Sequence, residues 1–290
     1  MRFDRSGLKV ECSRAARRGF VVALALTLAA CDTMSPSRDP GVAVIDKGDP
    51  AATTANIAAL SSIIAQSPND AQAYNTRGAA YAKAGRFPEA IADFSKAIQL
   101  QPDFAAALTN RALAYRQTNR NDAAMADFNR AIAAAPSYGP AYLGRGNLER
   151  AQGQFDQALA DLDQAIRFAP ESAEALHARG LIRQKQGNQQ AAISDFGAAI
   201  DRNPFAAPPY LGRGQSYLAI GQYQSAVDDF NAALNVDNRL VDAWAGRGLA
   251  YEKLGRKSEA VESYQQASTL DSSNATARAG LARLQRGAVL

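Results

Sequence analysis

The chain has 290 residues, of which 47% are hydrophobic and 21% charged, and its formal net charge at neutral pH is +4. The excess lies near the N-terminus: residues 1–30 hold six cationic and two acidic side chains, so the remaining residues carry 26 of each sign. A neutral body lacks the broad positive field that sequence-independent nucleic-acid binding requires, and we expect no nucleic-acid partner.

Residue types that metal and nucleophilic chemistry need are scarce. The cysteines are Cys12 and Cys31, whose spacing fits no metal motif, and the single histidine is His177. One histidine excludes a His-rich metal site and a pair of catalytic histidines. No glycine-rich phosphate loop follows a strand-like segment. We therefore expect no metal, no cofactor and no catalytic residue, and a protein that is not an enzyme.

Residues 1–30 have the features of a signal peptide. Three arginines between positions 14 and 18 precede Phe20–Ala30, an apolar run of eleven residues. This run is too short to span a bilayer, which needs about 20 residues, and it suits the apolar region of an export signal. It ends in the sequence LAAC, which resembles the lipobox of bacterial lipoproteins. The resemblance implies that Cys31 is lipidated, with palmitate-like acyl chains, and becomes the mature N-terminus.

Other interpretations of this region stay open. An ordinary signal peptide or a buried helix with a chance cysteine would show a similar run, and Arg17–Phe20 resembles part of a twin-arginine signal. Asp32 resembles the inner-membrane retention signal of enteric bacteria, so the choice between inner and outer membrane is undetermined. A lipoprotein carries two or three acyl chains, which is enough for firm anchoring on the periplasmic side of the envelope.

Residues 31–50 contain prolines and glycines and no helical periodicity, and we interpret them as a flexible linker. Such a linker would have a typical reach of about 25 Å and a maximum of about 60 Å. Residues 51–70 follow, with apolar residues at helical spacing and a proline, Pro68, one period before Pro102. We interpret them as an N-terminal half-repeat helix that covers the first full unit.

The rest of the chain is dominated by a 34-residue period, which indicates stacked supersecondary units. Position 8 of the unit is Gly78 in the first copy, and a glycine or alanine recurs there every 34 residues up to Gly248. Position 15 is glycine or asparagine, which ends a first helix because these residues accept left-handed backbone angles. The six units are 71–104, 105–138, 139–172, 173–206, 207–240 and 241–274, and residues 275–290 read as a C-terminal capping helix.

The unit resembles the tetratricopeptide repeat (TPR), whose pattern has an aromatic at position 4, Gly or Ala at 8, Tyr at 11, Ala at 20, an aromatic at 24, Ala at 27 and Pro at 32. Tyr74, Gly78, Tyr81, Ala90 and Phe94 show this pattern in the first copy. The resemblance implies an all-α fold, a right-handed superhelical solenoid of helix-turn-helix units with a concave inner groove.

Charged residues recur at two fixed positions of the unit. Position 7, usually leucine in this family, is arginine in every unit, and position 23 is aspartate in the first five, with Ser263 in the sixth. Both positions lie equally far from the turn, so we expect them to lie level on antiparallel helices as a structural ladder. Pairing within a repeat and pairing between neighbours both fit the count. The members are Arg77, Arg111, Arg145, Arg179, Arg213, Arg247, Asp93, Asp127, Asp161, Asp195 and Asp229.

In this family, positions 2, 5, 9, 12 and 13 of the first helix line the groove, and the resemblance carries partner binding to those positions. Cations recur at positions 12 and 13, which predicts a basic track for an acidic segment or a C-terminal carboxylate. Cations near a helix C-terminus also complement its dipole, and that explanation stays open. The candidate groove residues are Asn75, Lys83, Arg116, Asn147, Arg150, His177, Lys185, Gln215 and Lys253.

Together these features predict a membrane-anchored interaction scaffold in the bacterial cell envelope, which binds protein or peptide partners in the groove. A pilus or secretion-system assembly lipoprotein is the alternative. A non-catalytic part of a glycosyltransferase or other enzyme complex is the weaker one, because the repeats leave no room for a catalytic domain after residue 274.

Overall fold

The structure, a computed structural model, describes residues 50–286, and it gives the side chains from Thr54 onward. The proposed signal peptide, Cys31 and nearly all of the linker lie outside the described residues, as do residues 287–290. The described residues form fourteen helices and no strand. In chain order these are α1 (Pro50–Gln66), α2 (Ala71–Lys83), α3 (Phe87–Leu100), α4 (Ala105–Gln117), α5 (Asn121–Ala134), α6 (Gly139–Ala151), α7 (Phe155–Phe168), α8 (Ala173–Lys185), α9 (Gln189–Arg202), α10 (Ala207–Ala219), α11 (Tyr223–Val236), α12 (Val241–Lys253), α13 (Lys257–Leu270) and α14 (Ala275–Arg286).

The first helix of each unit ends where the sequence places its glycine or asparagine. After α2, Gly85 has a φ of +74°, and the equivalent Asn119 after α4 has a φ of +58°. A side chain with a Cβ disfavours these left-handed angles, and glycine and asparagine tolerate them best. In each unit the turn at position 15 therefore reverses the chain and lays the second helix antiparallel to the first.

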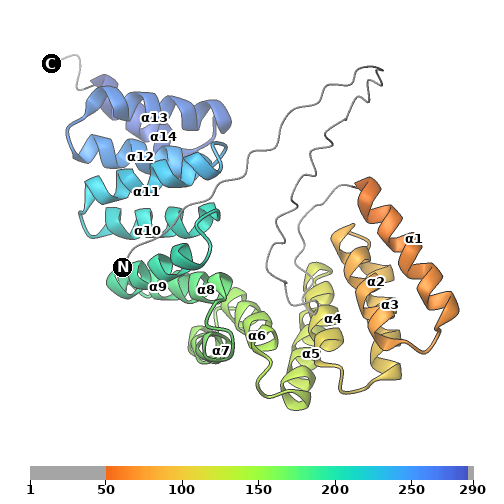
Figure 1. Ribbon diagram of the computed structural model, residues 1–290. Helices are drawn as coiled ribbons and strands as arrows, with labels where there is room; N and C mark the ends of the chain where they lie inside the picture. Colours follow the sequence, from red (N-terminus) through yellow and green to blue (C-terminus); the bar gives the residue numbers. More distant parts are fainter. Residues whose placement is uncertain (1–49, 287–290) are drawn as a thin grey trace, which may run out of the picture. The chain divides into compact units, whose positions relative to one another are not determined.

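The helices form two layers that differ in how closely their members approach. The first helices of successive units contact each other in series from α2 through α14, all even-numbered (Figure 1). The second helices contact their own and the next first helix, but among the described residues none contacts another second helix. The even-numbered helices therefore form the tighter, inner layer of the stack, and their exposed positions make the inner face. The predicted all-α solenoid of helix-turn-helix units is thus observed.

A large buried side chain at position 24 fills each junction between units, and it is an aromatic ring in every unit but the third, which has Leu162. Phe196 of α9 is fully buried, and an added Cβ at Gly180 of its own unit or at Gly212 of the next would lie 2.7 Å from its ring. At this junction, a glycine on each side allows both helices to approach the same ring closely. Glycine recurs at this second contact, position 6, at Gly144, Gly212, Gly246 and Gly280. The predicted pattern of small residues, at positions 8, 20 and 27, does not include position 6.

The two ends of the stack are covered by single helices. α1 packs on α2, and α14 packs on α12 and α13. α14 follows the pattern of a first helix, because Ala277 and Gly280 occupy positions 3 and 6 and Gly280 would meet Tyr264 if it carried a Cβ. None of the helices between residues 50 and 286 combines the length and apolar character needed to cross a membrane.

Candidate partner-binding face

The arginines at position 7 pair with the aspartates of their own unit. In the first unit, the Nε of Arg77 donates to Asp93 Oδ2 at 2.7 Å and its Nη2 donates to Asp93 Oδ1 at 2.8 Å, a two-point ion pair. The same two-point geometry recurs at Arg111–Asp127, Arg145–Asp161, Arg179–Asp195 and Arg213–Asp229. The ion pairs thus form within each repeat.

A third bond ties most of these arginines to the preceding unit. The Nη1 of Arg111 donates to Ser95 Oγ at 2.9 Å, and that of Arg179 donates to Asp163 Oδ1 at 2.7 Å. Both acceptors occupy position 25. The other acceptors at this position are Ser61, Asn129 and Asn231. Each of these arginines therefore joins two units as well as two helices.

Two members of the series depart from this pattern. Arg213 faces Gly197 at position 25, which has no side chain to accept its bond. Arg247 meets Ser263 instead of an aspartate, and its Nε donates to Ser263 Oγ at 3.1 Å. Without a carboxylate beside it, burial lowers the pKa of Arg247, whereas hydrogen bonding to Asp127 raises the pKa of Arg111.

The arginine–aspartate ladder lies inside the stack, and its charged groups are poorly accessible to a partner. Its aspartate side chains are at most 9% exposed, as at Asp93 beside Arg77. Charged groups with so little water around them are held by the partners they already have. The inner face is therefore the better candidate for a binding site.

Arg116 of α4 and Arg150 of α6 occupy position 12 of adjacent units and form the centre of that face. Both are half-buried. Burial, and then the positive charge of Arg150, lowers the pKa of Arg116. Within residues 50–286 neither arginine has a carboxylate at ion-pair distance; the Nε of Arg150 donates to Asn147 Oδ1 at 3.4 Å. Two adjacent, partly desolvated guanidinium groups form a site that favours an anion.

His177 of α8 extends this cluster. Burial, followed by the charge of Arg150, lowers the pKa of His177 to about 4, so the ring is neutral at physiological pH. The imidazole packs against Phe196, with ring centroids 5.6 Å apart. It can accept or donate a hydrogen bond to a ligand beside Arg150, but it adds no charge. We refer to Arg116, Arg150 and His177 as the arginine cluster.

The other predicted basic residues lie at position 13, in the last turns of α2, α8 and α12. The Nζ of Lys185 lies 5.0 Å from the centre of the Phe155 ring, at the start of α7. Lys83 and Lys253 are exposed at the ends of α2 and α12, where they complement the helix dipole.

One candidate groove residue is corrected by the structure. Asn75 has no exposed surface, and its Oδ1 accepts from the Nδ2 of Asn110 at 3.0 Å. A fully buried amide between α2 and α4 is not accessible to a partner. The family pattern places position 5 on the groove, but in the first unit Asn110 of the neighbouring helix covers Asn75.

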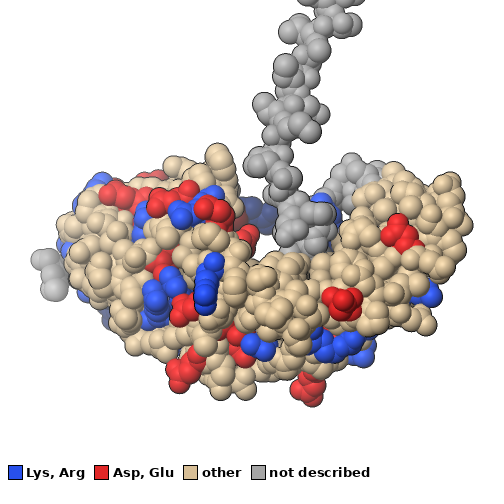
Figure 2. Space-filling model, turned by 60° about the horizontal axis from the view of Figure 1, so that its bottom comes forward, with Lys and Arg blue, Asp and Glu red and all other residues tan. Residues whose placement is uncertain are grey.

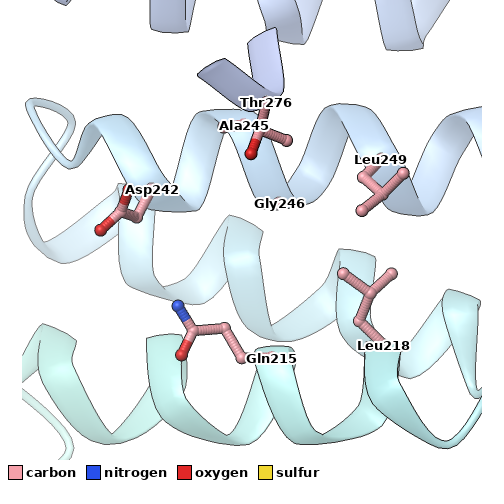
Figure 3. A pocket seen from close by; sticks show the side chains of 7 residues that line it. All are labelled: Gln215, Leu218, Asp242, Ala245, Gly246, Leu249 and Thr276. Atoms are coloured by element: carbon pink, nitrogen blue, oxygen red, sulfur yellow. The ribbon is translucent and has the colours of Figure 1, made fainter. Parts of the chain in front are cut away.

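Gln215 lies on the wall of a pocket of about 270 Å³ between α10, α12 and α14. In Figure 3 the side chains of Leu218 and Leu249 face each other across the gap between α10 and α12. Gln215 lies at the other end, on the same side as Asp242. The remaining lining residues are Ala245, Gly246 and Thr276. Apart from Gly246, the lining residues occupy inner-face positions of three successive first helices, which no single repeat in the sequence could reveal.

Elsewhere the charges are mixed. On the face shown in Figure 2, cationic and acidic side chains are interspersed without a large area of one sign. Across residues 50–286, no group of three or more His, Cys, Asp or Glu side chains is arranged to hold a metal ion.

Sequence comparison identifies the repeat unit directly. Family models described as tetratricopeptide repeat or TPR repeat match residues 71–104, 105–138, 146–187, 173–205 and 211–275. These matches together include most of the six predicted units. No curated protein sequence matches the chain.

Solved structures share the fold. A chain from the crystal structure of the APC/C hetero-tetramer Cut9–Hcn1 aligns with a TM-score of 0.70 and 18% identity, over 80% of this chain and 46% of that one. This chain therefore spans about half the length of that relative. PilW, described as a widely conserved type IV pilus biogenesis factor, aligns at 0.64 and 19% over 73% and 98%. YrrB, described as having an unusual peptide-binding site, aligns at 0.55 and 22% over 63% and 95%.

Proposed function

From the premise that this chain belongs to the tetratricopeptide repeat family, we propose that it is a membrane-anchored adaptor that captures an acidic peptide segment of a partner on its inner face. Tetratricopeptide repeat folds are scaffolds that bind protein or peptide partners. The acidic character of the partner rests on one observation: Arg116 and Arg150 lie side by side, half-buried, with no carboxylate at ion-pair distance among the described residues.

The electrostatic reason for this assignment is direct. Two like charges held close together repel each other, and an anion between them relieves that repulsion. A glutamate, an aspartate or a C-terminal carboxylate can accept from both guanidinium groups, and such charge-assisted bonds are strong where water is partly excluded. His177 beside them can donate or accept one further bond. No nucleic-acid partner is proposed, because the charge outside residues 1–30 is balanced.

The membrane part of the proposal rests on the sequence alone. Lipidation at Cys31 would hold the repeats on the periplasmic side of the bacterial cell envelope, and residues 32–49 would let them reorient above the membrane. Incorporation of labelled palmitate that is lost in Cys31→Ala is the expected result. Incorporation that persists in Cys31→Ala, or no incorporation in either protein, would overturn the anchor and leave the groove proposal standing.

A second role within the same class is assembly of a pilus or secretion machine. The fold likeness to PilW favours it, since this chain covers nearly the whole of that pilus biogenesis factor. At 19% identity the likeness concerns the fold, so the partner has to be identified by experiment.

The test is a crosslinking capture from membranes with full-length protein. Arg116→Gln with Arg150→Gln removes the cluster charges, and we expect loss of the captured partner with little change in thermal unfolding. Arg130→Gln with Arg167→Gln is the matched control, because these arginines lie on the second helices of the same two units. Equal capture by both variants would contradict the proposal. The identity of the captured protein separates a general adaptor from a pilus assembly factor.

A further inference from the structure

The pocket between α10, α12 and α14 has the dimensions of a subsite for one side chain. Its volume of about 270 Å³ falls below the range of about 300–1,000 Å³ that is typical of small-molecule sites. It opens on the inner face, and its first helix, α10, is the next inner-layer helix after α8 of the arginine cluster. A peptide lying along that face would therefore pass both features.

The chemistry of the pocket differs from one end to the other. Leu218 and Leu249 supply apolar walls, whereas Gln215 and Asp242 are exposed polar groups at the opposite end (Figure 3). In the described part of the chain, no hydrogen bond or ion pair of the Asp242 carboxylate is found. The carboxylate is a negatively charged acceptor, so this end attracts a donor or a cation.

The other inner-face acid of α12 is already occupied. The Nε and Nη2 of Arg283 each donate to Glu252 at 2.8 Å, and the hydroxyl of Tyr264 donates to it at 2.7 Å. These bonds lower the pKa of Glu252, with the bond to Arg283 as the largest cause. Asp242 is therefore the inner-face acid of α12 that remains open to a ligand.

We infer that this pocket binds a lysine or arginine side chain of the partner segment, an inference that rests on the proposed function. Long cationic side chains bury their methylene stems on apolar surface and keep the charged head at a polar group. Here the stem lies between Leu218 and Leu249, and the head pairs with Asp242. Other residue types use only one end of the pocket.

The two sites together define a polarised ligand. Its acidic residues lie at Arg116 and Arg150, and its basic residue lies toward the C-terminal end of the stack. A segment bound in the reverse direction would place carboxylates at Asp242 and a cation at the arginines. Like-charge contacts of this kind reject wrong partners and wrong registers. The inner face thus selects both the composition and the direction of the peptide.

The test uses a phage-displayed library of random dodecapeptides, selected against the purified full-length chain. We expect the enriched peptides to share an acidic group and one lysine or arginine at a fixed separation. A fluorescein-labelled copy of an enriched peptide then gives dissociation constants by fluorescence anisotropy. Replacing its basic residue with norleucine should weaken binding to the wild type about tenfold and leave binding to Asp242→Asn unchanged. Asp228→Asn, an exposed acid on the outer helix α11, is the matched control.

The outcomes separate this inference from the one it rests on. Enriched peptides that need Arg116 and Arg150 but lack a basic residue would overturn the pocket assignment and keep the proposed function. A norleucine peptide that weakens equally on wild type and Asp242→Asn would do the same. Peptides whose binding is unaffected by Arg116→Gln with Arg150→Gln would overturn the proposed function itself.

Discussion

Among the six arginines at position 7, Arg213 lacks a side-chain acceptor on the preceding unit, because Gly197 occupies position 25 there. An added Cβ at Gly197 would lie 3.5 Å from Arg213 Nη1, an ordinary contact distance. Asparagine is the residue that fills this role for Arg145 and Arg247. An asparagine at position 197 would therefore supply the acceptor that Arg213 lacks.

We predict that Gly197→Asn stabilises the protein more than Gly197→Ala does, by about 0.5 kcal/mol. Both replacements improve helix propensity in α9, but alanine is the better helix former, so propensity alone gives the opposite order. The bond to Arg213 reverses it. Urea unfolding of the two variants measures the difference, and the advantage of asparagine should vanish in an Arg213→Lys background. Alanine being the more stable variant would contradict the bond.

Glu149 carries a second residue-scale effect, because it replaces the tyrosine of position 11 inside the stack. Its side chain is buried, and its Oε2 has no partner among the described residues. Burial, and then the charge of Asp161, raises the pKa of Glu149 to about 7. The folded protein therefore holds a proton that the unfolded chain releases near its ordinary pKa of 4.5.

From this we predict that stability falls as pH rises through about 7. Below a pH of about 4.5, the stability that this carboxyl group contributes is fully present. As pH rises from there through the folded pKa, the free energy of unfolding falls by about 2 kcal/mol. Glu149→Gln mimics the protonated form and should be more stable than the wild type at pH 8, with a gain that shrinks toward pH 5. His177 acts in the opposite direction, losing stability as pH falls from about 6.5 to about 4. Both proteins contain His177, so its contribution cancels when the free energy of unfolding of Glu149→Gln is compared with that of the wild type. A gain independent of pH would refute the assignment.

At the scale of helices, position 6 sets how closely one unit can approach the next. Gly212 is pressed against the Phe196 ring, whereas the third junction pairs the smaller Leu162 with Ala178 at the same two positions. Ring size at position 24 and side-chain size at position 6 therefore vary together between these two junctions.

We expect Gly212→Ala to destabilise the protein by about 1–3 kcal/mol, because its Cβ would overlap a ring that has no free space. Gly197→Ala in α9 is the control, since the same replacement there meets no ring and should stabilise by up to about 1 kcal/mol. In a Phe196→Leu background the cost of Gly212→Ala should nearly disappear, as at the junction of Leu162 with Ala178. Thermal or urea unfolding gives all four values. An unchanged cost in that background would show that the ring is not the obstacle.

These junctions show what a repeat sequence can and cannot predict. The fixed period predicted the helices, their turns and the level positions of the arginine and aspartate series, because each depends on spacing within one unit. It left open whether Arg77 pairs within its own unit, and the structure shows the pair with Asp93. The acceptor for a third arginine bond is a serine, an asparagine or an aspartate, and Gly197 offers none at the same position, so no single residue type marked it. Burial of Asn75 depends on Asn110 of the next unit, and the pocket at Asp242 needs three units. The glycines of position 6 were visible in the sequence and would have predicted the close junctions.

At the scale of the whole molecule, the stack has no central core, because each described unit contacts only the units next to it. Tyr264 of α13 is fully buried and depends on α14, where Gly280 lies against its ring. In such an array stability is a sum of local terms, and damage at one end stays near that end. A globular core would instead spread the loss throughout the chain.

Ending the chain at Asn274 should therefore unfold its neighbourhood and spare the rest. Removal of α14 exposes the Tyr264 ring and takes Arg283 from Glu252, so we expect amide exchange in α12 and α13 to rise at least tenfold, while α2–α5 keep wild-type protection. Hydrogen exchange read by mass spectrometry measures this helix by helix, with a variant ending at Arg286 as control. Thr276 is lost with α14, so the pocket at Asp242 should weaken while an acidic peptide still binds Arg116 and Arg150. Equal loss of protection in every helix would mean that the units are coupled over the whole stack, and the two binding sites could not then act independently.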